Sequence, residues 1–242
     1  MDLKEIPTGA FLRHPWEVAR AAFFRGELRR AGLLSGARGV LDVGSGDAWL
    51  ARELTHAAEG LNVVCWDLGY EQASPAPSER VTYTATRPSG TFDLVLMLDV
   101  AEHVPDDRAF LRDVLACTAP GAHVLFSVPA WPSLFSAHDE ALGHYRRYTP
   151  RAARELLRDS GLDVVRGGGL FHSLLLPRYV QKLTRRANGT AAVADDLAWR
   201  GGRLLRSCVL GALAVDAGLS RVAASIKADV PGLSWWALCR RS

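Results

Sequence analysis

The stretch that most constrains the fold is "LDVGSGDAWL", residues 41–50. An apolar run ends at Val43, two glycines follow at Gly44 and Gly46, and helix-forming residues begin at Trp49. A strand, a tight glycine turn and a helix together let the backbone come close to a ligand, while the free N–H groups at the helix start bind its polar end. The stretch therefore predicts a cradle for a small molecule.

Two acidic residues narrow the kind of ligand. A dinucleotide site would read G-x-G-x-x-G, whereas "GSGDAW" has no third glycine in that place. Asp42, at the strand end, would repel a pyrophosphate and suits a ligand with an ammonium group. Asp67, which ends the next apolar run, can accept both hydroxyls of a ribose. A ligand with a ribose, an amino-acid part and no phosphate fits both acids.

The rest of the chain alternates short apolar runs with segments that can form helices. The runs suggest buried parallel strands, so we expect a doubly wound α/β sheet of Rossmann-like type. An amphipathic helix over residues 15–32 precedes it. The expected strands are residues 39–43, 62–66, 81–84, 92–98, 123–128, 162–168 and 233–241, with helices over 49–59 and 106–120.

The segment before the last strand is far longer than a normal connection. Residues 172–186 and 201–227 both read as helices with basic polar faces, separated by "ANGTAAVADD". We therefore expect an N-terminal helical segment (1–38), a core (39–171 and 231–242) and a helical insertion (172–230). The insertion is interpreted as a cap over the acceptor pocket or a homodimer surface, with peripheral membrane contact the less favoured alternative.

Composition disfavours several classes of function. A net charge of +3, from 29 basic and 26 acidic residues, is too small for a nucleic-acid footprint. The four cysteines are scattered without a C-x-x-C pair, which argues against a zinc cluster or a disulfide framework and favours a cytoplasmic protein. No run reaches the roughly 18 apolar residues of a membrane span.

Three motifs in order resemble the class I methyltransferases that use S-adenosylmethionine. "VLDVGSGDAWLARELT" is similar to their first motif, with Ala48 where a third glycine is usual, and "FDLVLMLDVAEHVPDD" is similar to their fourth strand and the following turn. The acid often found after the third strand is missing from "TATRPSG". The resemblance implies a sheet of order 3-2-1-4-5-7-6 with the last strand antiparallel. The cofactor residues it implies are Asp42, Gly44, Ser45, Gly46, Asp67, Leu68, Leu98 and Asp99.

Titratable residues after the fourth and fifth strands are candidates for catalysis. Asp99, Glu102 and His103 are spaced i, i+3, i+4 and would share one face of a helical turn. This resembles the E-x-x-E-H turn that holds a divalent ion in plant small-RNA 2′-O-methyltransferases and ubiquinone-pathway O-methyltransferases, with Asp99 in place of the first Glu. In the small-RNA enzymes another histidine follows the fifth strand, and His144 of "GHYRRYTP" matches that place. The alternatives are a His103 or His144 base without metal, and a turn that only packs.

The acceptor is expected to be a small molecule methylated at a hydroxyl or carboxyl oxygen. Arg146 and Arg147 suit a carboxylate or phosphate on it, and Tyr148 lies beside the same predicted pocket. The catalytic candidates are thus His144, His103, Asp99, Arg146 and Tyr148. Nitrogen or carbon methylation, RNA 2′-O-methylation, an NAD-type oxidoreductase and a cofactor-binding module without catalysis remain as alternatives.

Overall fold

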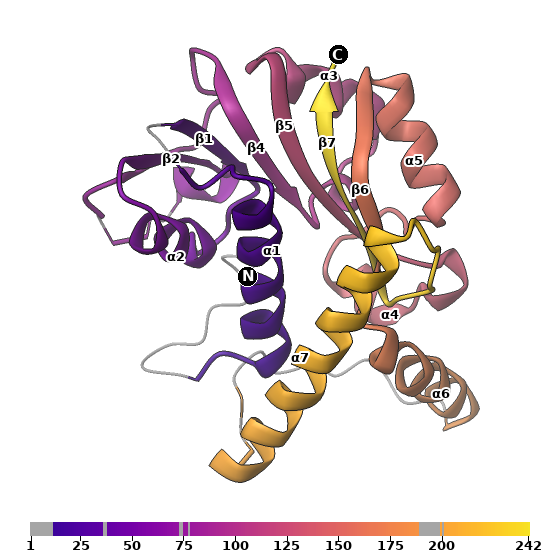
Figure 1. The fold of residues 1–242 in the computed structure, drawn as a ribbon. Helices are drawn as coiled ribbons and strands as arrows, with labels where there is room; N and C mark the ends of the chain where they lie inside the picture. The colour runs from indigo at the N-terminus through magenta and orange to yellow at the C-terminus, as the bar shows by residue number, and fades with distance from the viewer. Residues whose placement is uncertain (1–11, 36–37, 73–74, 77, 189–198, 200) are drawn as a thin grey trace.

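A computed structural model describes residues 12–35, 38–72, 75–76, 78–188, 199 and 201–242 of the chain. Its centre is a seven-stranded sheet in the order β3-β2-β1-β4-β5-β7-β6, drawn in Figure 1. β7 runs antiparallel to both of its neighbours, β5 and β6, while the remaining pairs are parallel. The predicted fold class and strand order are confirmed.

The elements follow the expected alternation. The strands are β1 (Arg38–Val43), β2 (Leu61–Trp66), β3 (Val81–Thr84), β4 (Phe92–Leu98), β5 (Thr118–Pro129), β6 (Leu162–Leu170) and β7 (Ser234–Arg241). The helices are α1 (Pro15–Arg30), α2 (Trp49–Ala57), η2 (Leu68–Glu71), η3 (Ala101–His103), α3 (Asp107–Leu115), η4 (Pro132–Leu134), α4 (Ala137–Ala141), α5 (Pro150–Asp159), α6 (His172–Asn188) and α7 (Arg203–Ser225).

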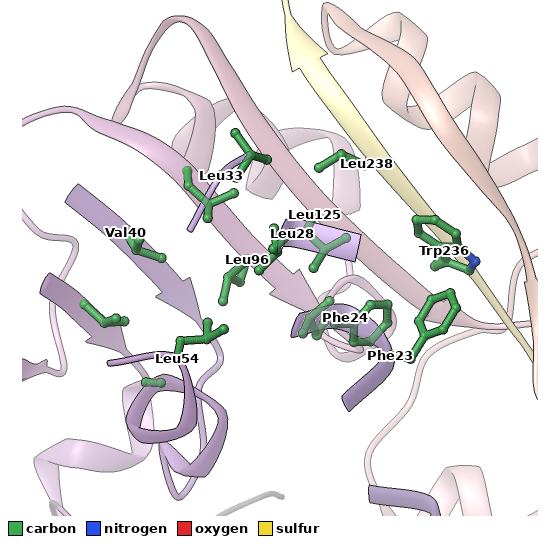
Figure 2. Packing of buried hydrophobic residues seen from close by; sticks show 14 of the residues in the cluster. Phe23, Phe24, Leu28, Leu33, Val40, Leu54, Leu96, Leu125, Trp236 and Leu238 are labelled. Atoms are coloured by element: carbon green, nitrogen blue, oxygen red, sulfur yellow. The ribbon is translucent and has the colours of Figure 1, made fainter. Parts of the chain in front are cut away.

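Helices cover both faces of the sheet. Because side chains alternate along a strand, Val40 of β1 joins the cluster formed with α1, α2 and α7, whereas Leu41 joins the cluster with α3 and α5. Figure 2 shows the first cluster, in which Phe23 of α1 meets Trp236 of β7 edge to face at 5.0 Å between ring centroids. α1 is thereby fixed across the sheet, with its first turns near the carboxyl ends of the central strands (Figure 1).

One predicted helix is too long. Residues 106–120 were expected to be helical, but α3 ends at Leu115 and β5 begins at Thr118. Pro120 has no N–H for a helix interior, and Gly121 adopts a positive φ of 73°. Thr118 instead pairs with Phe92 of β4, which lengthens β5.

The predicted insertion forms two helices tied to the core. Asp216 of α7 accepts hydrogen bonds from the backbone N–H groups of His172 (3.0 Å) and Ser173 (2.7 Å) and so caps the start of α6. Buried Glu27 of α1 pairs with Arg166 of β6 (2.7 Å) and Arg221 of α7 (3.3 Å). Most of "ANGTAAVADD" lies outside the described residues.

α7 contains no unbroken run of 18 apolar residues, because Arg206, Asp216 and Arg221 interrupt it, but its composition is apolar overall. Among the described residues it is the one helix long and apolar enough to cross a membrane by length and composition, and 33% of its most apolar window is buried. Its buried side packs on α1 and β6, the elements with which it shares most of its contacts.

Candidate active site

The glycine turn after β1 requires its glycines. Gly44 has a φ of 61°, and a Cβ there would lie 2.7 Å from a methyl group of Val100, closer than packing allows. Gly46 also has a positive φ, of 53°. Ala48, where the third glycine is usual, keeps the left-handed backbone at φ 54° as the N-cap of α2. The turn therefore retains the shape of the glycine motif despite the alanine.

Asp67 and Tyr70 brace this turn. The Asp67 carboxylate accepts hydrogen bonds from the backbone N–H groups of Gly46 and Gly69, both at 2.8 Å. The Tyr70 hydroxyl donates to the carbonyl of Gly46 (2.7 Å) and lies 2.9 Å from the Ser45 hydroxyl. Each carboxylate oxygen can accept a second bond, so Asp67 can still hold ribose hydroxyls. Leu68, 74% exposed beside it, offers an apolar surface.

A pocket lies between the glycine turn and α1. It encloses a space of about 550 Å³, including the part open to solvent. The predicted residues Asp42, Gly44, Ser45 and Leu98 all line it. From α1 come Trp16, Glu17, Arg20, Ala21 and Phe24, and from the turn and α2 come Asp47, Trp49 and Leu50.

The sequence analysis did not identify the α1 side of this pocket. The Arg20 guanidinium donates a hydrogen bond to one carboxylate oxygen of Asp99, and the Ser127 hydroxyl donates to the other at 2.8 Å. Asp99 has a φ of 57°, a strained backbone that this pair of contacts holds in place. An arginine at this position can also bind the carboxylate of an amino-acid ligand.

Asp42 is almost fully buried, with 5% of its surface exposed. Burial raises the pKa of Asp42 to about 7, and the nearby Arg20 partly offsets this by lowering it. A ligand ammonium would favour the ionised form. The pocket thus combines a carboxyl group whose pKa is near neutrality with a guanidinium. These two groups suit the ammonium and the carboxylate of an amino acid.

Three of the four predicted metal ligands lie close together, near Asp99. Glu102, His103 and His144 each offer one ligand atom, and these atoms lie within 4.8 Å of one another. The rings of His103 and His144 are perpendicular, with centroids 4.5 Å apart. Asp99 is not in the group, because its carboxylate is engaged by Arg20 and Ser127.

Glu102 is the notable member of this cluster. It is completely buried, and in the described part of the chain no other residue forms a hydrogen bond with either of its side-chain oxygens. Burial, and then the nearby Asp99 carboxylate, raise the pKa of Glu102 well above its usual value. A carboxylate in such a place either carries a proton or faces a cation.

A carboxylate that the sequence analysis overlooked orients His144. Nδ1 of His144 lies 3.0 Å from Asp139, leaving Nε2 as the nitrogen available to a ligand. Asp139 also accepts a hydrogen bond from Arg147 at 2.7 Å. Carboxylates commonly orient metal-binding imidazoles in this way. The S-x-x-D spacing of Ser136 and Asp139, here a capping box at the start of α4, was a readable signal for this carboxylate.

Hydrogen bonds hold in place the loop at residues 144–148, which includes the predicted catalytic residues Arg146 and Tyr148. The Tyr145 N–H donates to the carbonyl of Glu102 (2.7 Å) and Arg146 to that of Val104 (3.1 Å). The buried Tyr148 hydroxyl lies 3.1 Å from the carbonyl of Ala101 and 2.8 Å from Asp107. Residues 144–148 therefore lie along η3. Arg146 and Arg147 are directed to partners within the protein, Asp107 and Asp139, rather than to solvent.

The insertion lies on the same side as this loop. Lys182 of α6 donates to the carbonyls of Ser133 and Phe135, both at 2.6 Å, just before α4. The backbone N–H of Trp199 donates a hydrogen bond to the carbonyl of Leu12 (2.9 Å), and its indole ring packs on His14, which precedes α1. His172 contacts Ser220 of α7 and the carbonyl of Pro231, so it joins α6 both to α7 and to the start of the last core segment.

Comparisons with known proteins agree with this architecture. Residues 16–166 match the family model described as a methyltransferase domain. An uncharacterized methyltransferase of Mycobacterium sp. (strain KMS) is 32% identical over 118 residues, 46% of each chain. A ubiquinone biosynthesis O-methyltransferase of Vibrio parahaemolyticus is 36% identical over 101 residues, 36% of this chain and 42% of that protein. The chain thus spans less than half the length of these relatives.

Solved structures show the same fold at low identity. A mycolic acid cyclopropane synthase complexed with S-adenosylhomocysteine superposes with a TM-score of 0.58 and 16% identity, covering 98% of this chain and 92% of that chain. The family model covers more than half of the sequence, including the glycine turn, Asp67 and the turn after β4. The chain belongs to the methyltransferase domain family.

Proposed function

We propose that this protein is an S-adenosylmethionine-dependent methyltransferase that methylates an oxygen of a small-molecule acceptor, held beside a divalent metal ion that Glu102, His103 and His144 bind. The observation that carries the proposal is the buried Glu102 carboxylate, which lacks a hydrogen bond from another described residue and lies next to two imidazoles. The O-methyltransferase of Vibrio parahaemolyticus supports oxygen as the acceptor atom.

The residues fit a metal ion chemically. Two imidazoles and one carboxylate are a ligand set that suits Mn²⁺, Co²⁺ or Zn²⁺. A bound ion would compensate the charge of Glu102, because burying an ionised carboxylate without a partner is unfavourable. Three protein ligands leave coordination positions for an acceptor. When bound, the ion lowers the pKa of a hydroxyl that it contacts.

The protein's own residues would supply binding and alignment. Methyl transfer from a sulfonium needs little covalent assistance, so most of the rate enhancement comes from holding the acceptor oxygen in line with the methyl group. In our proposal Asp42 and Arg20 hold the amino-acid part of the cofactor, and Asp67 holds its ribose. η3 and the loop at residues 144–148 then place the acceptor next to the turn after β4.

Metal binding can be measured before an acceptor is known. Purified protein is stripped with chelator and titrated with Co²⁺, whose visible absorption reports nitrogen and oxygen ligands. We expect one tight site, which Glu102→Gln and His144→Ala each weaken at least tenfold. His56→Ala is the matched control, since His56 is exposed on α2, and it should leave the affinity unchanged. Equal affinity in all variants would overturn the metal assignment.

Turnover then separates the remaining alternatives. With labelled S-adenosylmethionine, phenols, catechols and carboxylic acids are compared with amines. We expect an oxygen-methylated product whose formation stops with chelator and returns with Mn²⁺ or Co²⁺. Turnover that ignores chelator but falls about 10²- to 10⁴-fold in His144→Ala would instead identify His144 as a direct base. Methylation of amines alone would contradict the oxygen assignment.

A further inference from the structure

The outward side of α7 carries apolar residues that recur at intervals of three and four. We call this row the α7 seam; it consists of Leu205, Cys208, Ala212, Val215, Leu219, Val222 and, at the C-cap, Ile226. All seven are exposed, including Val215 at 69% and Ile226 at 71%. An average spacing of 3.5 residues is the repeat by which two helices pack side by side.

Contacts on the opposite side of α7 fix the seam facing outward. Leu213, Ala217 and Ala224 are buried against the core, and Arg221 is paired with Glu27. Between Arg206 and Arg221 the only charged residue is Asp216, which is buried at the start of α6. The outward side of this stretch is therefore uncharged, so an approaching surface of the same kind meets no repulsion.

Two glycines next to the seam favour a helix as the partner. Gly211 and Gly218 lie inside α7, where glycine weakens a helix. Among the described residues, nothing lies within 4 Å of a Cβ placed at either position, so packing within the chain does not require them. Small residues on an exposed helix face let a second backbone approach closely. A lipid surface makes no such demand.

The seam is complementary to itself when reversed. Apart from Leu205, its first half holds the small residues Cys208 and Ala212, and its second half holds the larger Leu219, Val222 and Ile226. With Val215 at the centre of an antiparallel pair, Ala212 faces Leu219 and Cys208 faces Val222, so small residues meet large ones. A parallel pair would place Ala212 against Ala212. Antiparallel pairing also brings Arg203 near the partner's helix C-terminus, where a cation is favourable.

We propose that α7 pairs antiparallel with α7 of a second copy, forming a homodimer through the seam. A helix of 23 residues presents a strip about 35 Å long and about 10 Å wide, on the order of 350 Å² for each copy. Exposed apolar patches of this size commonly mark interaction sites. The area is small for a protein interface, so the dimer dissociates at micromolar concentration.

Sedimentation velocity across about 1 to 100 µM tests the proposal. We expect a monomer–dimer equilibrium in which Leu219→Glu raises the dissociation constant at least 100-fold. Gly218→Leu should raise it at least tenfold while leaving the far-ultraviolet spectrum of the monomer intact, because the space around Gly218 is open. Val165→Glu on β6, 57% exposed and outside the seam, is the matched control and should change it less than twofold.

Cross-linking tests the direction of the pair. Cys208 is the only exposed cysteine of the four in the sequence. In Val222→Cys, oxidation should join Cys208 of one copy to position 222 of the other, and adding Cys208→Ser should abolish the cross-link. Cross-linking of the unmodified chain through Cys208 alone would overturn the antiparallel arrangement.

Two results would overturn the dimer itself. One is a monomer at every concentration in the sedimentation experiment. The other is a monomer that co-sediments with vesicles of phosphatidylcholine and phosphatidylglycerol and loses this binding in Leu219→Glu, which would assign the seam to a lipid surface. Gly218→Leu would then leave vesicle binding unchanged.

Discussion

Arg20 of α1 is hydrogen bonded to Asp99, which lies 79 residues later in the turn after β4. This contact joins the N-terminal helix to the residue at the carboxyl end of the central strand. Because Arg20 also lines the pocket with Asp42, the same guanidinium is placed to meet the carboxylate of the cofactor's methionine part. α1 therefore forms one wall of this pocket and is not only a cover over the sheet.

Replacing Arg20 by Met should weaken binding of S-adenosylmethionine about tenfold, as expected for the loss of one charge-assisted contact. Calorimetry with 5′-methylthioadenosine, which lacks the amino-acid part, should show less than a twofold change. Arg25→Met is the control, because Arg25 lies on the same helix and pairs with Glu53 outside the pocket. An equal loss for both ligands would mean that Arg20 acts through the shape of the pocket.

Asp67→Ala should weaken both ligands at least tenfold, because both contain the ribose whose hydroxyls this carboxylate would accept. The variant also removes one hydrogen bond to Gly46 of the glycine turn and one to Gly69 of η2, so Tyr70→Phe serves as a control that loosens the glycine turn without touching the ribose. If Tyr70→Phe costs as much affinity as Asp67→Ala, the ribose assignment fails.

The pocket residues differ in how well the sequence predicts them. Gly44, Gly46 and Asp67 were identified because each lies in a local pattern of strand, turn and helix. Ala48 fits the same pattern by adopting the backbone that a glycine would. Arg20 has no such signal, since its partner Asp99 is brought to it only by the packing of α1 across the sheet.

The same distinction applies to the candidate metal site. Spacing predicted Glu102 and His103, the resemblance to the small-RNA methyltransferases added His144, and the structure brings these three residues together. Asp99 shares their helical spacing, but its positive φ turns it toward Arg20 and Ser127. Arg146, Arg147 and Tyr148 were expected to face the acceptor, yet a sequence does not reveal that Asp107 and Asp139 lie close enough to engage them.

Cofactor affinity should depend on pH through Asp42. Burial raises the pKa of Asp42 to about 7, and the ionised form is the one that pairs with an ammonium. Affinity should therefore rise about tenfold between about pH 5.5 and 7, as the ionised fraction grows, and level off above the pKa. Asp42→Asn should bind more weakly at pH 7 and show a flat profile. Affinity that falls as the pH rises would show that the neutral carboxyl is the binding form.

Asp139→Asn should lower the affinity for Co²⁺ about 10- to 100-fold, the usual effect of removing a carboxylate that orients a metal-binding histidine. Burial alone would raise the pKa of Asp139, but hydrogen bonds from His144 and Arg147 hold it well below its usual value. The carboxylate is therefore ionised throughout the working pH range, and its charge makes the His144 imidazole a stronger ligand. Asparagine keeps an oxygen acceptor for the ring without that charge.

The Asp139→Asn variant also leaves Arg147, whose side chain is 6% exposed, without its buried anion, so its melting temperature should fall. Titrations are therefore made at a temperature where its near-ultraviolet spectrum matches that of the unmodified protein. Asp159→Asn, at an exposed ion pair on α5, provides the matched change elsewhere and should leave Co²⁺ affinity unaltered. Unchanged affinity in folded Asp139→Asn, alongside a loss in His144→Ala, would limit Asp139 to holding Arg147 and the start of α4.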